Sequence, residues 1–267
     1  EDLMTTMTSY ANGVPSWVDL ATPDPSASKK FYGELFGWNY DDESAEPDPD
    51  SVEYAMADID GHATAGIMQQ TTEMAETGMP PVWTTYVAVD DLDASMAKVE
   101  PAGGSLMGPA MDIMEAGRMV VVADPAGAVF CMWEAKGHIG AGIVNEPGAF
   151  SWSELITPDP AAVAPFYGAV FGWTAETAPM PSGSYTVFSV AGGNENGIAG
   201  AMAPPVEGMP AAWGVYFSVA DARATVETAR SLGAQVLMEA TEMPGVGTLA
   251  ALMDPHGAAF SIMQAPA

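Results

Sequence analysis

The chain has 267 residues, and its 35 acidic against 7 basic side chains give a formal net charge of −28 at pH 7. A surface this acidic repels nucleic-acid phosphates and anionic lipid headgroups, so neither is an expected partner. No apolar run approaches the ~18 residues that a membrane span needs, and the first ten residues lack the basic and apolar regions of a signal peptide. A single cysteine, Cys131, excludes an internal disulfide. We therefore expect a cytoplasmic location.

The excess of acidic residues is best interpreted as a halophilic adaptation, because salt screens the repulsion among surface carboxylates. An acidic patch for a basic partner is the alternative, but the acids are scattered and only Asp41-Asp42-Glu43 form a cluster. If the adaptation is real, the melting temperature should rise between ~0.01 and ~1 M salt, where the Debye length falls from ~30 to ~3 Å.

The first predicted elements occupy a segment that occurs twice. Residues 16–38 read SWVDLATPDPSASKKFYGELFGW, and residues 151–173 read SWSELITPDPAAVAPFYGAVFGW, with 14 of the 23 positions identical. Alternating side chains around Trp17 and Asp19 predict a strand with two distinct faces. Asp24 can then cap a helix with Pro25 at its first position, and Gly37 sits where this helix must stop.

Three strands and a loop complete the first unit, and a second unit follows. The predicted strands cover 38–42, 52–60 and 62–69, and residues 70–81 form a loop. A strand over 82–89 then precedes a helix that Asp90 or Asp91 caps and that runs through Val99. Strands over 105–113, 118–123 and 128–134 follow. The order β-α-β-β-β thus occurs twice in each half, and residues 135–149 form a surface connector between the halves.

This arrangement resembles the vicinal oxygen chelate superfamily, which includes glyoxalase I, bleomycin-resistance proteins and extradiol dioxygenases. The segments PSWVDLATPD, FYGELFGW, AGRMVVVADPAGA and DPHGAAF are similar to tandem glyoxalase-like proteins of actinobacteria, a group with a culture-filtrate antigen and proteins labelled hydroxylases. The resemblance implies an α+β fold of four βαβββ units in two tandem glyoxalase-like domains, whose curled mixed sheets form cups. The expected boundaries are an extension over 1–14, domains over 15–134 and 150–267, and a connector over 135–149.

The resemblance also implies where a metal ion would bind. The superfamily's ligand positions fall on residues that are mostly unable to bind a metal: Trp17, Gly66 to Met68, Thr84 and Cys131 in the first half, and Trp152, Gly200 to Met202, Gly214 and Ser261 in the second. A catalytic zinc or iron site needs about three N, O or S ligands. We therefore expect no metal and no other cofactor, and we expect His62, His138 and His256 to be solvated loop residues.

Strand alternation predicts the side chains that face each cup. In the first cup these are Trp17, Asp19, Thr84, Tyr86, Val129, Cys131 and Trp133; in the second they are Trp152, Glu154, Gly214, Tyr216, Ala259, Ser261 and Met263. Aromatic walls with one carboxylate suit a flat organic ligand with a hydroxyl, amine or cationic centre. The aromatic side chains could equally fill the cups as core. Cys131 is expected to be a small buried side chain rather than a nucleophile.

Several functions remain open at this point. The first is a small-molecule-binding protein that holds or sequesters an aromatic or hydrophobic metabolite or antibiotic, as a monomer or homodimer. The alternative is a metal-independent isomerase, lyase or hydrolase-like enzyme with Asp19 or Glu154 as acid or base. A metal-dependent lyase or dioxygenase is the third hypothesis, and a structural protein with filled cups is the weakest. Because Gly214, Ala259 and Ser261 are small, we expect the second cup to be the occupied one.

Overall fold

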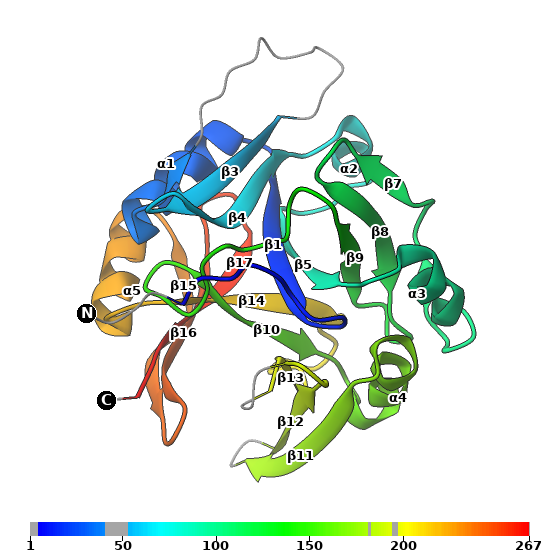
Figure 1. Ribbon diagram of the computed structural model, residues 1–267. Coiled ribbons are helices and arrows are strands. Elements are labelled where there is room, and N and C mark those ends of the chain that lie inside the picture. Colours follow the sequence, from blue (N-terminus) through cyan, green and yellow to red (C-terminus); the bar gives the residue numbers. More distant parts are fainter. Residues whose placement is uncertain (1–4, 41–52, 181–182, 194–196, 267) are drawn as a thin grey trace.

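The computed structural model describes residues 5–40, 53–180, 183–193 and 197–266. It has the expected α+β architecture, with one curled sheet in each half (Figure 1). The elements of the first half are β1 (Pro15–Thr22), α1 (Pro25–Phe36), β2 (Asn39–Tyr40), β3 (Tyr54–Ile59), β4 (His62–Gln69), α2 (Thr72–Glu76), β5 (Val82–Ala88), α3 (Leu92–Val99), β6 (Ser105–Leu106), β7 (Met111–Ile113), β8 (Gly117–Ala123) and β9 (Val129–Ala135).

The second half repeats this order with small differences. Its elements are β10 (Phe150–Ile156), α4 (Pro160–Phe171), β11 (Thr174–Met180), β12 (Gly183–Ser189), β13 (Ala199–Met202), β14 (Ala212–Ser218), α5 (Ala222–Ser231), β15 (Gln235–Met243), β16 (Gly247–Met253) and β17 (Ala259–Gln264). Among the described residues, no helix is long and apolar enough to cross a membrane.

Each sheet joins the two units of its half through their first strands. The order in the first sheet is β2-β3-β4-β1-β5-β9-β8-β6, with β7 also on β8, and in the second it is β11-β12-β13-β10-β14-β17-β16-β15. The central pairs β1–β5 and β10–β14 are antiparallel, whereas β1–β4, β5–β9, β10–β13 and β14–β17 are parallel. This topology puts the first strand of every unit at the centre of a sheet, beside the middle of a cup.

The helices begin and end where the sequence predicts. Asp24 accepts a hydrogen bond from the backbone N–H of Ala27 at 2.9 Å, and Asp91 caps α3 in the same way. Asp159 and Asp221 repeat the cap in the second half. Gly37 has φ +76°, a left-handed conformation that favours glycine and ends α1.

Two local predictions were wrong. Residues 105–113 do not form one strand but two short ones, β6 and β7, both paired with β8. Pro109 lies between them and has no N–H to donate to a ladder. The predicted loop over 70–81 contains the helix α2, which Thr71 caps by accepting from the N–H of Met74. Parts of the predicted strands over 38–42 and 52–60 lie outside the described residues.

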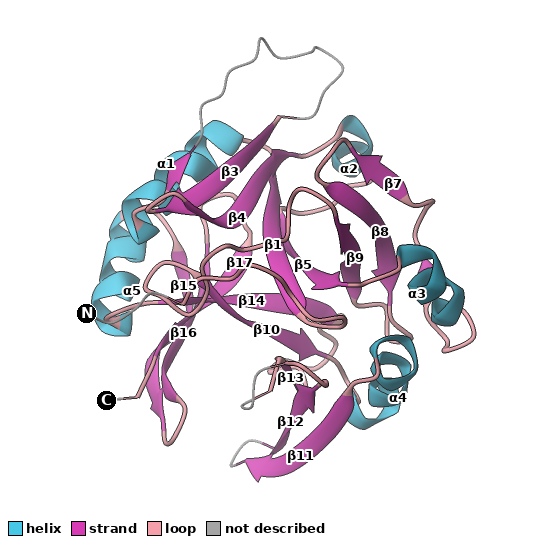
Figure 2. Ribbon diagram, viewed as in Figure 1, coloured by secondary structure: helices cyan, strands magenta, loops and turns pink. Residues whose placement is uncertain are grey.

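Four of the helices, α1, α3, α4 and α5, contribute to cores that both halves share. Figure 2 shows α1 beside α5 and α3 beside α4, at opposite sides of the molecule. One apolar core joins Phe31, Tyr32 and Trp38 of the first half to Phe217 and many other residues of the second. A second core joins α4 of the second half to the β8–β9 region of the first half. Burial of this size makes each half a substantial part of the other's core.

The repeated sequence motifs form the contact between the halves. The Tyr32 hydroxyl donates to Asp254 Oδ2 at 3.0 Å and accepts from Trp83 Nε1 at 3.0 Å. The second half returns the same contacts: Tyr167 donates to Asp124 Oδ2 at 2.9 Å and accepts from Trp213 Nε1 at 3.1 Å. The FYG, Trp and Asp-Pro motifs that reveal the duplication are therefore one reciprocal hydrogen-bonded interface, and the cups face away from it.

Candidate functional site

Asp19 lies at the floor of the first cup, in the middle of β1. Its neighbours Val18 and Leu20 are fully buried in the core shared by the halves, so alternation turns Asp19 to the opposite face. Its carboxylate is 3% exposed, and Oδ2 accepts a hydrogen bond from the Tyr86 hydroxyl at 2.7 Å. Burial raises the pKa of Asp19 to about 7, although the hydrogen bonds from Tyr86 and Tyr54 oppose the shift.

Tyr54 of β3 is a site residue that the sequence analysis missed. Its hydroxyl accepts from Trp17 Nε1 at 2.9 Å and lies 3.5 Å from Asp19 Oδ2. Although the side chain as a whole is 46% exposed, this hydroxyl reaches the cup floor because Gly66 has no Cβ to block it. An alignment of the two halves contained the signal, since Tyr185 and Gly200 stand at the same places in the second half.

The connector covers the first cup, and the prediction that His138 is a solvated loop residue was wrong. The His138 ring lies 4.6 Å from the Trp17 ring, edge to face, and 5.9 Å from the Trp133 ring. Its Nε2 is buried without a hydrogen-bond partner among the described residues. Burial lowers the pKa of His138, which favours the neutral imidazole.

The segment at residues 5–14 holds the connector in place. Tyr10 donates from its hydroxyl to the carbonyl of Ala141 at 2.7 Å, and the N–H of Met7 donates to the carbonyl of Gly142 at 2.9 Å. From below, the N–H of Ala141 donates to the carbonyl of Ser16 at 2.7 Å. The connector is therefore bound both to the cup and to the segment above it.

The remaining walls of the first cup are closely packed. Trp17, Tyr86, Cys131 and Trp133 form an apolar cluster with Ala141 of the connector. Trp133 Nε1 also donates to the carbonyl of His138 at 2.8 Å. Burial and the nearby Asp19 raise the pKa of the Cys131 thiol, so it is a poor nucleophile. Thr84 is half-buried, and Val129 lies exposed at the rim. The cluster around Trp17 therefore fills the inner part of this cup.

The second cup has the same floor with a more accessible wall. Glu154 is 6% exposed, and its Oε2 accepts from the Tyr216 hydroxyl at 2.8 Å. Trp152 Nε1 donates to the Tyr185 hydroxyl at 3.0 Å. Burial raises the pKa of Glu154, and the hydrogen bonds from Tyr216 and Tyr185 oppose this. In contrast to their counterparts in the first cup, the residues Trp152, Tyr216, Ser261 and Met263 are all partly exposed.

Three substitutions between the halves give the second cup smaller side chains. Thr84, Cys131 and Trp133 of the first cup become Gly214, Ser261 and Met263 in the second. A Cβ on Gly214 would meet only the Glu154 carbonyl oxygen, at 3.7 Å, so a larger side chain could stand opposite Glu154 without a clash. Ala259, like Val129, is exposed at the rim.

The residues present do not fit the metal ion that the superfamily implies. The ligand positions carry Trp17, Thr84 and Cys131 in the first cup and Trp152, Gly214 and Ser261 in the second. Cys131 has a raised pKa, so its metal-binding thiolate is disfavoured. Over the described part of the chain, no group of three or more His, Cys, Asp or Glu side chains could hold a metal ion.

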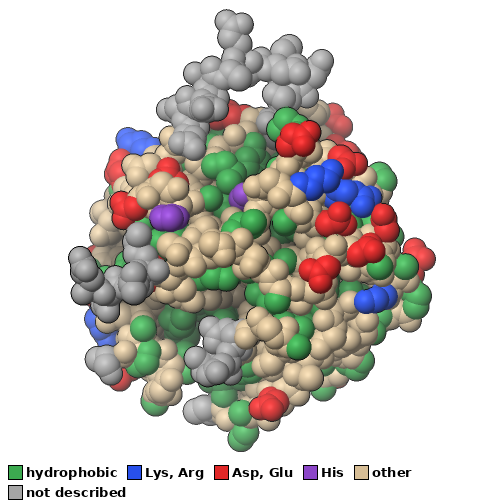
Figure 3. All heavy atoms as spheres, viewed as in Figure 1, with side chains coloured by type: hydrophobic (Ala, Val, Ile, Leu, Met, Phe, Trp, Pro, Cys, Tyr) green, Lys and Arg blue, Asp and Glu red, His purple; other side chains and the backbone are tan. Residues whose placement is uncertain are grey.

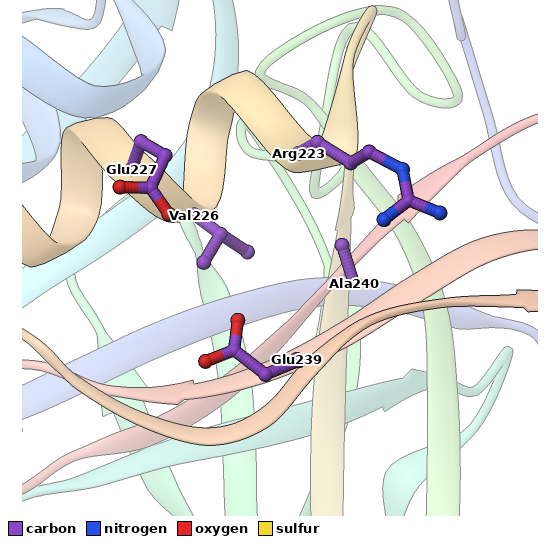
Figure 4. Close-up of a pocket in the computed structure, with 5 residues that line it drawn as sticks. All are labelled: Arg223, Val226, Glu227, Glu239 and Ala240. Carbon is purple, nitrogen blue, oxygen red and sulfur yellow. The ribbon is translucent and has the colours of Figure 1, made fainter.

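Two surface pockets lie outside the cups. One, of about 270 Å³, lies between α5 and β15, where Arg223, Val226 and Glu227 of the helix face Glu239 and Ala240 of the strand (Figure 4). Its two carboxylates already pair with Arg230, which leaves little for a ligand to bind. The other, of about 370 Å³, lies between α4 and the β11–β12 hairpin. Neither is lined by a residue that the sequence predicts to face a cup.

Apart from Asp19, Asp124, Glu154 and Asp254, which are buried, the charged side chains of the described residues are at least partly exposed. In the view of Figure 3, acidic side chains are scattered, and Lys and Arg lie beside them over β7, β8 and α3. There Arg118 binds Asp93 at 3.1 Å, and Lys136 binds Asp112 at 3.1 Å. This arrangement resembles a solvated charged surface rather than a single acidic patch.

A chain with two curled βαβββ sheets, each with a buried carboxylate under aromatic side chains, is a two-cup protein of the vicinal oxygen chelate type. It belongs to the Glyoxalase/Bleomycin resistance protein/Dioxygenase superfamily, whose family profile matches residues 15–132; a Glyoxalase-like domain profile matches residues 153–263.

Relatives align over nearly the whole chain. The protein named "Putative glyoxylase CFP32" of Mycobacterium bovis is 47% identical and covers 96% of both chains. The "Anthracycline biosynthesis protein DnrV" of Streptomyces peucetius is 37% identical and covers 97% of this chain and 95% of its own.

Solved structures share the fold at low sequence identity. A Mn(II)-bound glyoxalase from Novosphingobium aromaticivorans is 15% identical with a TM-score of 0.63, and the match covers 95% of this chain and 83% of that one. A 2,2',3-trihydroxybiphenyl 1,2-dioxygenase from Sphingomonas wittichii is 14% identical with a TM-score of 0.67, covering 95% and 91%. These matches extend across both cups.

Proposed function

We propose that this protein binds a flat, hydroxylated aromatic molecule in the second cup, without a metal ion. The observation that carries the proposal is the difference in burial between equivalent walls. Trp17, Tyr86 and Cys131 are buried under the connector, whereas Tyr216 and Ser261 are partly exposed around Glu154. Partly exposed aromatic side chains around a polar floor are typical of small-molecule sites.

The polar groups of the second cup suit a ligand with a hydroxyl. Glu154 is an acceptor, and the Tyr185 and Tyr216 hydroxyls can accept as well as donate. Gly214 is the register partner of Glu154 and places no side chain beside this floor. A relative from Streptomyces peucetius is named for anthracycline biosynthesis, and this name supports an aromatic ligand for the present chain. Binding, shelter or sequestration of such a molecule would need no further group from the protein.

The test is whether filling the space at Gly214 removes binding. The Gly214→Thr variant gives the second cup the side chain that the first cup has at Thr84, and the backbone there tolerates a Cβ. With 2-naphthol as the probe, titration calorimetry should show at least a ~10-fold weaker affinity, ~1.4 kcal/mol, with an unchanged melting temperature. Asp19→Asn, in the covered first cup, is the matched control and should bind as the wild type does. An unchanged affinity in Gly214→Thr would contradict the proposal.

Acid–base catalysis is a second candidate function, and the pKa of Glu154 favours it. Burial raises this pKa toward the range in which a carboxyl can give and take a proton near neutral pH. Asp19 has a similar environment but lies under the connector. If a bound ligand is turned over, Glu154→Gln should abolish turnover even at a ligand concentration that saturates the variant. Equal turnover in the variant would exclude this role.

We also propose the finer properties that the sequence suggests: domains over 15–134 and 150–267, a cytoplasmic location, a halophilic surface, and a monomer or homodimer without nucleic-acid or membrane partners. The scattered acids and their few surface ion pairs support the halophilic interpretation. Light scattering at low and high salt would measure the oligomeric state.

A further inference from the structure

The carboxylate of the second cup has no positively charged partner in the part of the chain that the structure describes. The seven Lys and Arg residues of the chain lie elsewhere, and the ion pairs of the described residues join Lys29, Lys30, Arg118, Lys136 and Arg230 to surface acids. Glu154 receives hydrogen bonds only from neutral tyrosine hydroxyls. A buried carboxylate that lacks a counter-charge is costly, and the cost is relieved when a cation arrives.

The surroundings of Glu154 are aromatic on three sides. Trp152 comes from the same strand, Tyr185 from β12 and Tyr216 from β14, and the sheet register places Trp152 directly opposite Tyr216. All three are partly exposed, so a ligand can reach them. Aromatic rings attract organic cations through their negative faces, and a carboxylate adds direct charge attraction.

The geometry therefore points to a ligand class, and we propose that the molecule bound in the second cup carries an organic cation, a protonated amine or a quaternary ammonium group, beside Glu154. The inference rests on the proposed function, since it concerns the ligand of the same cup. The cationic group would approach Glu154 on the side of Gly214, which is the register partner of Glu154 and has no side chain of its own. The opposing interpretation is a protonated Glu154 that donates to a neutral ligand.

Two probes of equal shape separate these interpretations. The 3-hydroxyphenyltrimethylammonium ion and 3-tert-butylphenol differ in one atom, a charged nitrogen in place of a carbon. Because a net charge of −28 attracts any cation, the titrations are made in 1 M NaCl, where the Debye length is ~3 Å. We expect the cation to bind about 10-fold more tightly than the phenol, because the Glu154 carboxylate attracts the charged nitrogen and has no such attraction for the neutral carbon.

Three variants test whether Glu154 causes the tighter binding of the cation. Glu154→Gln keeps the shape of the side chain and should reduce the ratio of the two affinities to about one, whereas Asp19→Asn should leave the ratio unchanged. Gly214→Thr should weaken both probes. If Glu154→Gln fails to fold, the wild-type ratio still decides the matter.

The affinities of the two probes decide between the cation inference and the proposed function. Equal binding of the two probes in the second cup, or tighter binding of 3-tert-butylphenol, would overturn the cation inference and leave the proposed function standing. A preference for the cation that persists in Glu154→Gln, or that disappears in Asp19→Asn, would also overturn it. Binding of neither probe would overturn both the inference and the proposed function.

Discussion

The two cups share one plan and differ in what lies above the floor. Both have a carboxylate on the central strand, a tyrosine from the neighbouring unit that donates to it, and a tryptophan bonded to a second tyrosine. In the first cup, the connector and the His138 ring cover these groups, and Cys131 and Trp133 fill the remaining space. In the second, Ser261 and Met263 are partly exposed.

This difference shows how a duplicated fold can separate stability from binding. The first cup contributes a third apolar core next to the two cores that join the halves. A cup filled in this way stabilises the fold but leaves little room for a ligand. The second cup keeps the same floor, but its wall side chains are partly exposed, as a binding site requires. Three experiments test whether the contrast is real.

The largest expected effect concerns the pH dependence of stability. The pKa of Asp19 is about 7 in the folded protein and ~3.9 when unfolded, so the folded state holds this proton more tightly. Its contribution to the free energy of unfolding is complete below pH ~4 and is lost as the pH rises through 7, a change on the order of 4 kcal/mol. Urea unfolding of Asp19→Asn should show a flatter pH profile and greater stability than the wild type at pH 8.

The matched variant is Glu154→Gln in the more accessible cup. It should flatten the pH profile of stability in the same direction but by less. Water reaches part of this cup and reduces the free energy that burial costs the charged Glu154 carboxylate. Equal changes in the two variants, or a wild-type profile that Asp19→Asn does not alter, would remove the distinction between a covered and an open cup.

The next effect concerns access to the cup walls. Cys131 is 2% exposed and its thiol pKa is raised, so it should react slowly with a thiol reagent. A cysteine introduced as Ser261→Cys in a Cys131→Ser background occupies the equivalent place in the second cup. It should react with dithiobis(nitrobenzoic acid) about 100-fold faster, because no local opening has to precede the reaction. Similar rates would show that the connector does not close the first cup.

The smallest effect should be identical in the two halves. Tyr32→Phe removes a hydroxyl that bonds to Asp254 and Trp83, and Tyr167→Phe removes the equivalent hydroxyl. Each leaves buried polar atoms unpaired and should cost ~2 kcal/mol in the free energy of unfolding, measured with urea. Costs that differ by more than ~1 kcal/mol would mean that the halves have diverged in their shared interface as well as in their cups.

More of the fold than of the candidate site could be predicted from the sequence. The repeat, the helix caps at Asp24 and Asp91, and the alternation around Asp19 are local signals, and the structure follows them. Tyr54 and Tyr185 were overlooked because which side chain of a hairpin strand reaches the cup depends on its register with β4 or β13. The strand predicted over 105–113 was wrong because periodicity alone gave no weight to Pro109.

The sequence by itself determined the duplication, the four units, the net negative charge and the carboxylate on each central strand, because these depend on composition, on motifs and on the fixed period of a strand. Only the tertiary structure decided that His138 lies over Trp17, that the FYG motif of one half bonds to the Asp-Pro turn of the other, and that the first cup is covered. Such contacts join residues that are distant along the chain, and their geometry exists only after the two halves pack together.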